Sequence, residues 1–215
     1  RKRTPEWDRS RKQFPGYRRS GTAKNPHLLG SQSVTGNDES HFNRPSSVAI
    51  GLNGEIYVGD GHGGDSNARV LMFNADGSFV KSWGQLGPEP GNFDQPHAMA
   101  VDSTGRLFVG DRANSRIQIF DAEGNFLEEW RQFGRPSGLY IDNNDMIYVA
   151  DSQSDETLNP GFEQGIRIGS TTDGVVTEFI HGPKMEGTPE GVAVDNAGNV
   201  YVGYTGGTNF KRFVK

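Results

Sequence analysis

The chain has 215 residues, enough for one large domain or two small ones, and its 22 Lys and Arg against 27 Asp and Glu give a formal net charge of -5. Hydrophobic residues make up only 33%, but the 30 glycines bring the apolar share to an ordinary level, which argues against disorder throughout. Cysteine is absent, so a disulfide framework, a thiolate nucleophile and a Cys-ligated zinc are excluded. The Gly-x-Ser-x-Gly elbow, the phosphate-binding loop and an apolar run of about 20 residues are also absent.

The N-terminal segment differs in composition from the rest. Residues 1–29 hold nine Lys and Arg and two acidic residues, a local charge of +7, so the remainder carries -12. This segment has no apolar period, and we expect residues 1–25 to be a basic, disordered leader ahead of a domain at 26–215. The leader is either a tether to an anionic surface or a solvated tail. Because the acidic remainder opposes a polyanion, no nucleic-acid partner is expected.

A repeat organises the chain after the leader. Four similar segments begin at prolines 45, 96, 136 and 189, which are 51, 40 and 53 residues apart. Each opens a series of short runs separated by turn residues, a pattern that predicts strands. The expected strands are 44–50, 56–60, 69–73 and 79–83; then 95–101, 107–111, 116–120 and 126–130; then 135–141, 147–151, 166–168 and 175–180; and finally 188–194, 200–204 and 210–213.

Four strands joined by tight turns form one blade of a β-propeller, so the fold class is all-β with four recognisable blades. The last unit has no fourth strand before Lys215, and residues 27–30 carry a short apolar run ahead of the first proline. We therefore expect residues 27–30 to complete the last blade.

Specific phrases carry a resemblance to known propellers. Residues 60–73 and 109–120 resemble the NHL repeat, and residues 42–215, with the phrases 133–138, 159–162 and 190–193, resemble the bacterial six-bladed propellers grouped with peptidyl-α-hydroxyglycine α-amidating lyase. The resemblance implies an NHL-type ring of six blades, so four blades indicate a truncated or divergent member. It also implies a secreted or periplasmic protein, although the chain begins at Arg1 with no signal peptide.

The resemblance also implies a metal-dependent carbon-nitrogen lyase that releases glyoxylate. In that family three histidines hold zinc, and an arginine and a tyrosine assist the cleavage. His97 matches one ligand, Glu190 stands where another histidine is expected, and residues 152–164 supply no histidine. Zinc held by His97 and Glu190 is therefore the expected metal site. Calcium bound by the carbonyls of Val48 and Met99 is a further expectation, although carbonyls without a carboxylate make a poor calcium site.

His97 also differs from its counterparts in the repeat. The equivalent positions are Ser46, Ser137 and Glu190, so every unit places a polar residue at the start of the innermost strand, where it is expected to face the mouth of the ring. An imidazole and a carboxylate there can bind zinc with solvent completing the shell. The alternative is a hydrogen-bonded histidine at a loop end. His62, in a loop with two acids, is either an additional ligand or a solvated side chain.

Arg69 and Tyr140 are the expected catalytic residues, and we expect both to lie with His97 and Glu190 at the mouth of the central channel. Arg69 matches the lyase arginine, although Arg116 and Arg167 occupy similar positions, which favours an architectural role. Tyr140 breaks the repeat, because its counterparts are Ala49, Ala100 and Ala193. A tyrosine at such a position can act as a general acid or base.

Two functions remain open at this point. One is an amidating-lyase-like propeller with weak or lost activity. The other is a non-enzymatic NHL propeller that binds a small peptide, another protein or a glycan at the face of the ring, because the fold alone does not choose between these functions.

Overall fold

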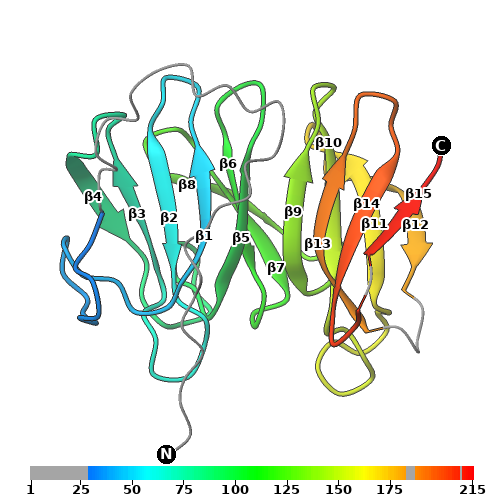
Figure 1. The fold of residues 1–215 in the computed structure, drawn as a ribbon, viewed down its shortest axis with the longest axis horizontal. Coiled ribbons are helices and arrows are strands. Elements are labelled where there is room, and N and C mark those ends of the chain that lie inside the picture. Colours follow the sequence, from blue (N-terminus) through cyan, green and yellow to red (C-terminus); the bar gives the residue numbers. More distant parts are fainter. Residues whose placement is uncertain (1–28, 183–186, 209) are drawn as a thin grey trace, which may run out of the picture.

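The computed structural model describes residues 29–182, 187–208 and 210–215, and these form four antiparallel sheets with no α-helix. Figure 1 shows the four sheets side by side as blades. Blade 1 consists of β1 (Pro45–Ile50), β2 (Ile56–Asp60), β3 (Arg69–Phe73) and β4 (Phe79–Trp83); blade 2 of β5 (Pro96–Val101), β6 (Leu107–Asp111), β7 (Arg116–Phe120) and β8 (Phe126–Trp130); blade 3 of β9 (Pro136–Ile141), β10 (Met146–Asp151), β11 (Gly165–Ser170) and β12 (Val176–His181); and blade 4 of β13 (Thr188–Val194), β14 (Val200–Thr205) and β15 (Phe210–Phe213).

The expected all-β fold with four blades is confirmed. The leader at 1–25 lies outside the described residues. The six-bladed ring that the resemblance implied is not seen, because four repeats supply only four sheets. The described residues contain no helix that is long and apolar enough to span a bilayer.

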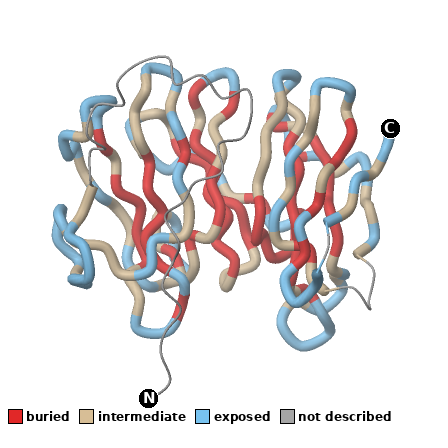
Figure 2. Tube along the Cα trace, viewed as in Figure 1, coloured by how far each residue is buried: buried red, intermediate tan, exposed pale blue. Residues whose placement is uncertain are grey.

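Neighbouring blades join through apolar cores. The innermost strands lie in the order β1, β5, β9 and β13, each beside the next. Figure 2 shows buried chain concentrated in the middle strands and exposed chain in the loops at both ends. One core joins blades 1 and 2 through Tyr57, Val70, Phe93 and Phe120, and Phe108, Phe133 and Ile147 form the next.

Leu29 corrects the expectation for residues 27–30. Its side chain packs against Val58, Leu71 and Phe73 of blade 1, and blade 4 contains only three strands among the described residues. Residues 27 and 28 lie outside the described range. Leu29 therefore packs on blade 1, and the described part of the segment 27–30 does not form the fourth strand of blade 4.

Each innermost strand has a proline at its first or second residue, followed by a β-bulge. The proline faces Asp60, Asp111, Asp151 or Tyr204 near the end of the second strand, and the pairing then skips one residue: Ser46, His97, Ser137 or Glu190. A bulge leaves its extra residue out of the ladder and re-aims its side chain. The four residues that stand in equivalent positions in the repeat are therefore the four bulge residues.

Candidate functional site

The bulge residues bring polar groups from different blades together at one end of the inner strands. Ser46 Oγ donates to the carbonyl oxygen of Pro96 at 2.5 Å, and His97 Nδ1 lies 2.7 Å from the carbonyl oxygen of Ser137. Ser46 and His97 thus reach the next blade, whereas Glu190 meets His97 and Arg112 of blade 2. We call the group formed by His62, His97, Arg112 and Glu190 the mouth cluster.

The hydrogen bond to Ser137 fixes the tautomer of His97. A carbonyl oxygen only accepts, so Nδ1 of His97 carries the proton and Nε2 presents a lone pair when the ring is neutral. Two groups face this lone pair. His62 Nε2 lies 2.9 Å from His97 Nε2, and Glu190 Oε1 lies 3.3 Å from the same atom. His62 Nε2 therefore donates to His97 when both rings are neutral.

The surroundings of His97 keep its ring neutral. Burial lowers the pKa of His97 most, and the positive charge of Arg112 lowers it further. The hydrogen bond to Ser137 and the charge of Glu190 act in the opposite direction but do not reverse the shift. A basic nitrogen that stays unprotonated at neutral pH is available as a general base or as a metal ligand.

Arg112 belongs to the mouth cluster although the sequence did not indicate it as a site residue. It is almost fully buried, its Nη1 donates to Glu190 Oε1 at 3.1 Å, and its Nε donates to Gln95 Oε1 at 2.9 Å. Nη2 takes part in neither bond. A signal was present in the repeat, because the equivalent position, one residue after Asp60, Asp111, Asp151 or Tyr204, holds Gly61, Ser152 or Thr205 in the other blades.

A second buried guanidinium lies close to Arg112. Arg135 contributes to the lowered pKa of Arg112, after burial, which is the largest cause. The Nη atoms of Arg135 donate to Ala113, Ser115 and Gln153, while its buried Nε has no hydrogen-bond partner among the described residues. Arg135 also interacts with the carboxylate of Asp155, so Arg112 is the cation of the mouth cluster that can meet an anionic ligand.

Arg69 makes a different set of contacts. Its Nε donates to Asp60 Oδ2 at 3.1 Å, and its Nη atoms donate to the carbonyl oxygens of Asn37, Asp38 and His41. Arg116 makes the corresponding bonds in blade 2, to Asp111 and to carbonyl oxygens of the loop before β5. These contacts give Arg69 an architectural place in the fold and do not bring it into the mouth cluster.

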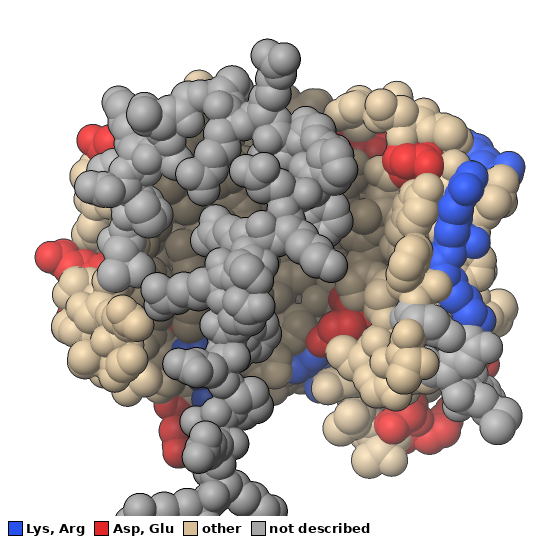
Figure 3. Space-filling model, viewed as in Figure 1, with Lys and Arg blue, Asp and Glu red and all other residues tan. Residues whose placement is uncertain are grey.

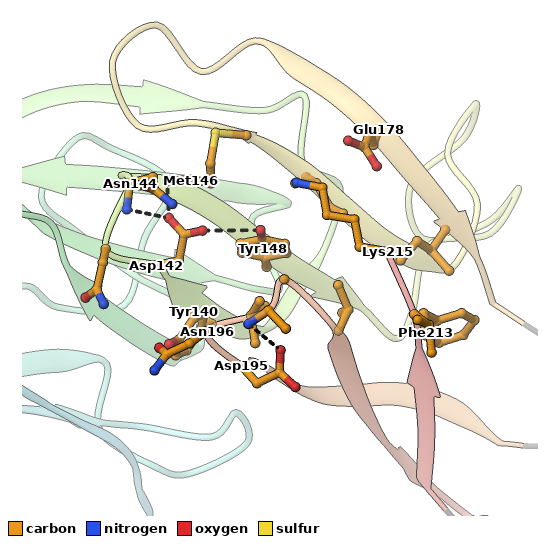
Figure 4. A pocket seen from close by; sticks show the side chains of 18 residues that line it. Tyr140, Asp142, Asn144, Met146, Tyr148, Glu178, Asp195, Asn196, Phe213 and Lys215 are labelled. Atoms are coloured by element: carbon orange, nitrogen blue, oxygen red, sulfur yellow. Dashed lines mark hydrogen bonds between the residues drawn. The ribbon is translucent and has the colours of Figure 1, made fainter.

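Tyr140 lies at the other end of the inner strands, in a cavity of about 570 Å³ between blades 3 and 4. Figure 4 shows Tyr140 and Tyr148 in this cavity with Asp142, which accepts a hydrogen bond from Tyr148. The two tyrosine rings are 6.2 Å apart, and burial raises the pKa of Tyr148 to about 12. The expected meeting of Tyr140 with His97 at the mouth is therefore not observed, because Tyr140 is placed near the end of β9 and not at its bulge.

The donor types of the mouth cluster suit zinc, but their arrangement does not yet make a site. In the ranges that the structure describes, no group of three or more His, Cys, Asp or Glu side chains is arranged to hold a metal ion. His97 meets both His62 and Glu190 through the single atom Nε2. Zinc at His97 and Glu190, and calcium at the carbonyls of Val48 and Met99, therefore remain predictions.

Two family models match parts of the chain. The model described as NHL repeat matches residues 93–120, and the model described as strictosidine synthase-like, N-terminal, matches residues 177–208. Peptidyl-glycine alpha-amidating monooxygenase B of Xenopus laevis is 31% identical over 193 residues, which cover 82% of this chain. The chain is an NHL-type propeller related to the amidating lyases. Peptidyl-alpha-hydroxyglycine alpha-amidating lyase 2 of Drosophila melanogaster is 31% identical to this NHL propeller over 85 residues, or 39% of the chain.

The NHL propeller spans about a fifth of the length of these two relatives, 21% of the frog protein and 20% of the fly protein. Among solved structures, the hydrazine synthase of Kuenenia stuttgartiensis is similar with a TM-score of 0.59 and 17% identity. That match covers 87% of the NHL propeller and 48% of the solved chain, and it supports the fold alone.

Proposed function

We propose that the mouth cluster binds a peptide-like substrate with a terminal carboxylate and cleaves a carbon-nitrogen bond, as an amidating-lyase-like propeller. The observation that carries this proposal is the neutral His97 Nε2 beside a buried arginine, because the reaction needs a base and an anion-binding group close together. The relatedness to lyases supports the same reaction class.

The residues of the cluster have separate roles in the proposed reaction. Arg112 pairs its Nη2 with the carboxylate of a peptidyl-α-hydroxyglycine, while Glu190 holds Nη1 in place. His62 is exposed on its loop, so it can turn away and leave the Nε2 lone pair of His97 to the substrate hydroxyl.

The bonds and protons balance without an oxidant. Nε2 of His97 takes the hydroxyl proton, the oxygen lone pair forms the C=O bond of glyoxylate, and the electrons of the C–N bond go to the amide nitrogen. That nitrogen takes a proton from solvent water and leaves as a peptide amide, and His97 returns the proton that it took to the solvent, so no net proton is gained or lost. A zinc ion bound in the cluster would supply a Lewis acid for the hydroxyl or carboxylate oxygen. The catalytic roles expected for Arg69 and Tyr140 remain predictions, and the contacts favour Arg112 as the arginine that meets the substrate.

Glyoxylate release from a synthetic peptidyl-α-hydroxyglycine tests the proposal. We expect His97→Gln to lower the rate at least about a hundredfold, the lower end of what general acid–base catalysis contributes. Arg112→Lys should raise KM, because lysine cannot keep both the Glu190 bond and the substrate pair. Arg131→Lys is the matched control, since Arg131 is exposed and pairs with Glu129 at the surface. Release that is unchanged in His97→Gln would contradict the proposal.

The cavity between blades 3 and 4 supports a second function, non-enzymatic binding of a peptide, protein or glycan. Its volume lies within the ordinary range for ligand pockets, and Tyr140 and Tyr148 supply ring faces beside carboxylates. Asp142, Asp195 and Glu178 line it, so we expect a ligand that carries a positive charge. Titration calorimetry with a library of basic peptides tests this function, and Tyr140→Ala should weaken binding while leaving glyoxylate release unchanged.

A further inference from the structure

Arg112 is held at its Nε atom by a neutral partner. Its Nε donates to Gln95 Oε1 at 2.9 Å, and its backbone N–H donates to the carbonyl oxygen of Gln95, also at 2.9 Å. Gln95 lies at the start of blade 2, directly before Pro96 of β5. One residue therefore contacts both the side chain and the main chain of the arginine of the mouth cluster.

The architectural arginines have a charged partner at the same atom. Nε of Arg69 donates to Asp60, and Nε of Arg116 donates to Asp111. Both carboxylates are fully buried, so each neutralises its guanidinium and leaves little of the charge for a ligand. An amide oxygen accepts the same hydrogen bond without a charge, so the bond at Nε does not neutralise Arg112.

Glu190 offsets the charge of Arg112 only in part. Its Oε1 accepts from Arg112 Nη1 at 3.1 Å and also lies 3.3 Å from His97 Nε2. The side chain of Glu190 is 27% exposed and is screened by solvent, whereas the side chain of Arg112 is only 6% exposed. The guanidinium is therefore fixed at Nε by the amide and at Nη1 by the carboxylate, and Nη2 is the nitrogen that remains for the carboxylate of a ligand.

Glutamine is a departure from the repeat at this position. The residue before the proline of the inner strand is Arg44 in blade 1, Arg135 in blade 3 and Thr188 in blade 4. Both arginines donate to carbonyl oxygens of loops that follow a second strand. An arginine at position 95 would bring another positive charge to Arg112, whereas Gln95 supplies an acceptor.

Gly63, in the loop 61–66 that carries His62, lies against the amide of Gln95. A guanidinium N–H only donates, so the amide must turn its oxygen toward Arg112. The NH2 group then lies beside Gly63, where a Cβ would collide with Nε2 and lie 3.2 Å from Cδ of Gln95. Glycine at position 63, with a φ of 75°, therefore lets the amide approach the loop of blade 1 closely and keep its orientation toward Arg112.

The visible surface at the mouth end carries both charges. Strands β9 and β13 run upward in Figure 1, so their bulges lie at the lower end of that view. Figure 3, drawn from the same side, shows Asp and Glu next to Lys and Arg at this end, whereas a strip of Lys and Arg lies along the edge near β15 and the C-terminus. Mixed charges largely cancel at a distance, so recognition of a carboxylate at the mouth depends on how Arg112 is placed.

We propose that Gln95 is a positioning residue for substrate binding, which fixes Arg112 as a charged group directed at the substrate carboxylate. This inference rests on the proposed function, because it concerns the carboxylate that Arg112 binds there. It makes the mouth selective for peptides with a free terminal carboxylate over their C-terminal amides. A peptide amide offers only a neutral oxygen, which makes a weaker hydrogen bond with a guanidinium than a carboxylate does.

Titration calorimetry with N-acetyl-phenylalanyl-glycine and its C-terminal amide tests the inference without any turnover. We expect the wild type to bind the acid at least about tenfold more tightly than the amide. Gln95→Met keeps the length of the side chain but removes the acceptor, so the ratio of the two dissociation constants should fall toward one. Gln95→Glu should lower the ratio as well, because its carboxylate neutralises Arg112, whereas a purely structural role would tolerate this isosteric change.

Gln132→Met is the matched control for these variants. Gln132 is exposed, and its amide donates to Gly174 between blades 2 and 3, away from Arg112. The control removes one side-chain hydrogen bond by the same substitution, and it should leave the ratio of the dissociation constants unchanged.

A second pair of variants acts on Gln95 through the loop 61–66. Gly63→Ala strains a positive φ and displaces the amide of Gln95, so it should lower the ratio as Gln95→Met does. Gly64→Ala strains a φ of 63° in the same loop, but its Cβ would meet only Arg44 Nη1, at 3.2 Å. It should therefore leave the ratio unchanged.

The outcomes separate this inference from the lyase reaction. A preference for the acid that Gln95→Met and Gln95→Glu abolish supports the inference even where no glyoxylate is released, a result that would contradict only the lyase reaction. Equal ratios in the wild type and Gln95→Met would overturn the inference, and so would a wild type that binds acid and amide alike. In the glyoxylate assay Gln95→Met should raise KM at least about tenfold and leave kcat unchanged, and a fall of kcat alone would overturn the role in binding.

Discussion

Replacing Arg69 with lysine separates a catalytic from an architectural role for this residue. Arg69 is almost fully buried and donates to Asp60 and to the carbonyl oxygens of Asn37, Asp38 and His41. These bonds attach the loop that precedes β1 to the third strand of blade 1. Lysine keeps the charge, but its single ammonium cannot reach the positions of a planar fork.

The expected loss of stability follows from the number of bonds. Lysine at position 69 can replace one or two of the four bonds, so at least two charge-assisted hydrogen bonds are lost. Such bonds contribute about 1.5–3 kcal/mol each, and water can replace part of them because the loop lies at the surface. We therefore expect Arg69→Lys to lower the free energy of unfolding by about 2–4 kcal/mol. Arg116→Lys, with its corresponding bonds in blade 2, should lower it by at least as much.

Urea unfolding and glyoxylate release, measured on the same preparations, provide the assay. The folded fraction of both lysine variants should release glyoxylate at the rate of the wild type. A catalytic role predicts another result: Arg69→Lys unfolds at the same urea concentration as the wild type but releases glyoxylate at least about tenfold more slowly, whereas Arg116→Lys keeps the wild-type rate. That pattern would refute the architectural reading of Arg69.

Three further predictions concern pH and packing. Burial and Arg112 lower the pKa of His97 from 6.5, so His97 is protonated in the unfolded chain at a higher pH than in the folded chain. The free energy of unfolding should therefore decrease below about pH 6.5. Urea titrations at pH 7.5 and 5.5 should show a smaller decrease for His97→Gln than for the wild type. Burial raises the pKa of Tyr57 from 10.0 to about 12, so the free energy of unfolding should fall as the pH rises from 10 to 12. Tyr57→Phe should lessen this fall, and at pH 7 it should lower the free energy of unfolding by about 1 kcal/mol because the hydrogen bond to Ala122 is lost. Gly110→Ala should lower the free energy of unfolding by about 1–2 kcal/mol, because a Cβ there would lie 2.9 Å from Leu139 Cδ1 and 3.0 Å from Pro136 Cβ. Gly203→Ala should raise it by about 0.5 kcal/mol, because a Cβ there meets no atom within 4 Å, and equal effects of the two variants would contradict this difference in packing.

The strands were predictable because each blade repeats a local pattern. Proline, a short apolar run and a tight turn recur in the same order, with glycine in the turn of three blades and Asp145 at positive φ in the third blade, and these signals act within a few residues of one another. The bulge residues were found by the same comparison, as four equivalent positions. The fold and the location of His97 and Glu190 at one mouth therefore followed from the alignment of the repeats.

Contacts between blades were less predictable. Departure from the repeat selected Tyr140, but the position of a residue along its strand decides which end of the blade it reaches, and Tyr140 lies near the end of β9. The same rule applied one residue after the second strand would have selected Arg112. Its bond to Glu190 joins residues 78 positions apart in the chain, and no local pattern indicates such a pair.

The side chains at the bulges can vary without changing the strand pairing that forms the propeller. Ser46, His97, Ser137 and Glu190 occupy one structural position with three different side chains, and in each blade the strand pairing on both sides of that position is preserved. A residue outside the ladder contributes little to strand pairing, so new side chains there are tolerated. Four such positions, drawn from four blades toward one opening, offer protein engineers a compact set of sites at which to graft a new recognition chemistry onto an unchanged scaffold.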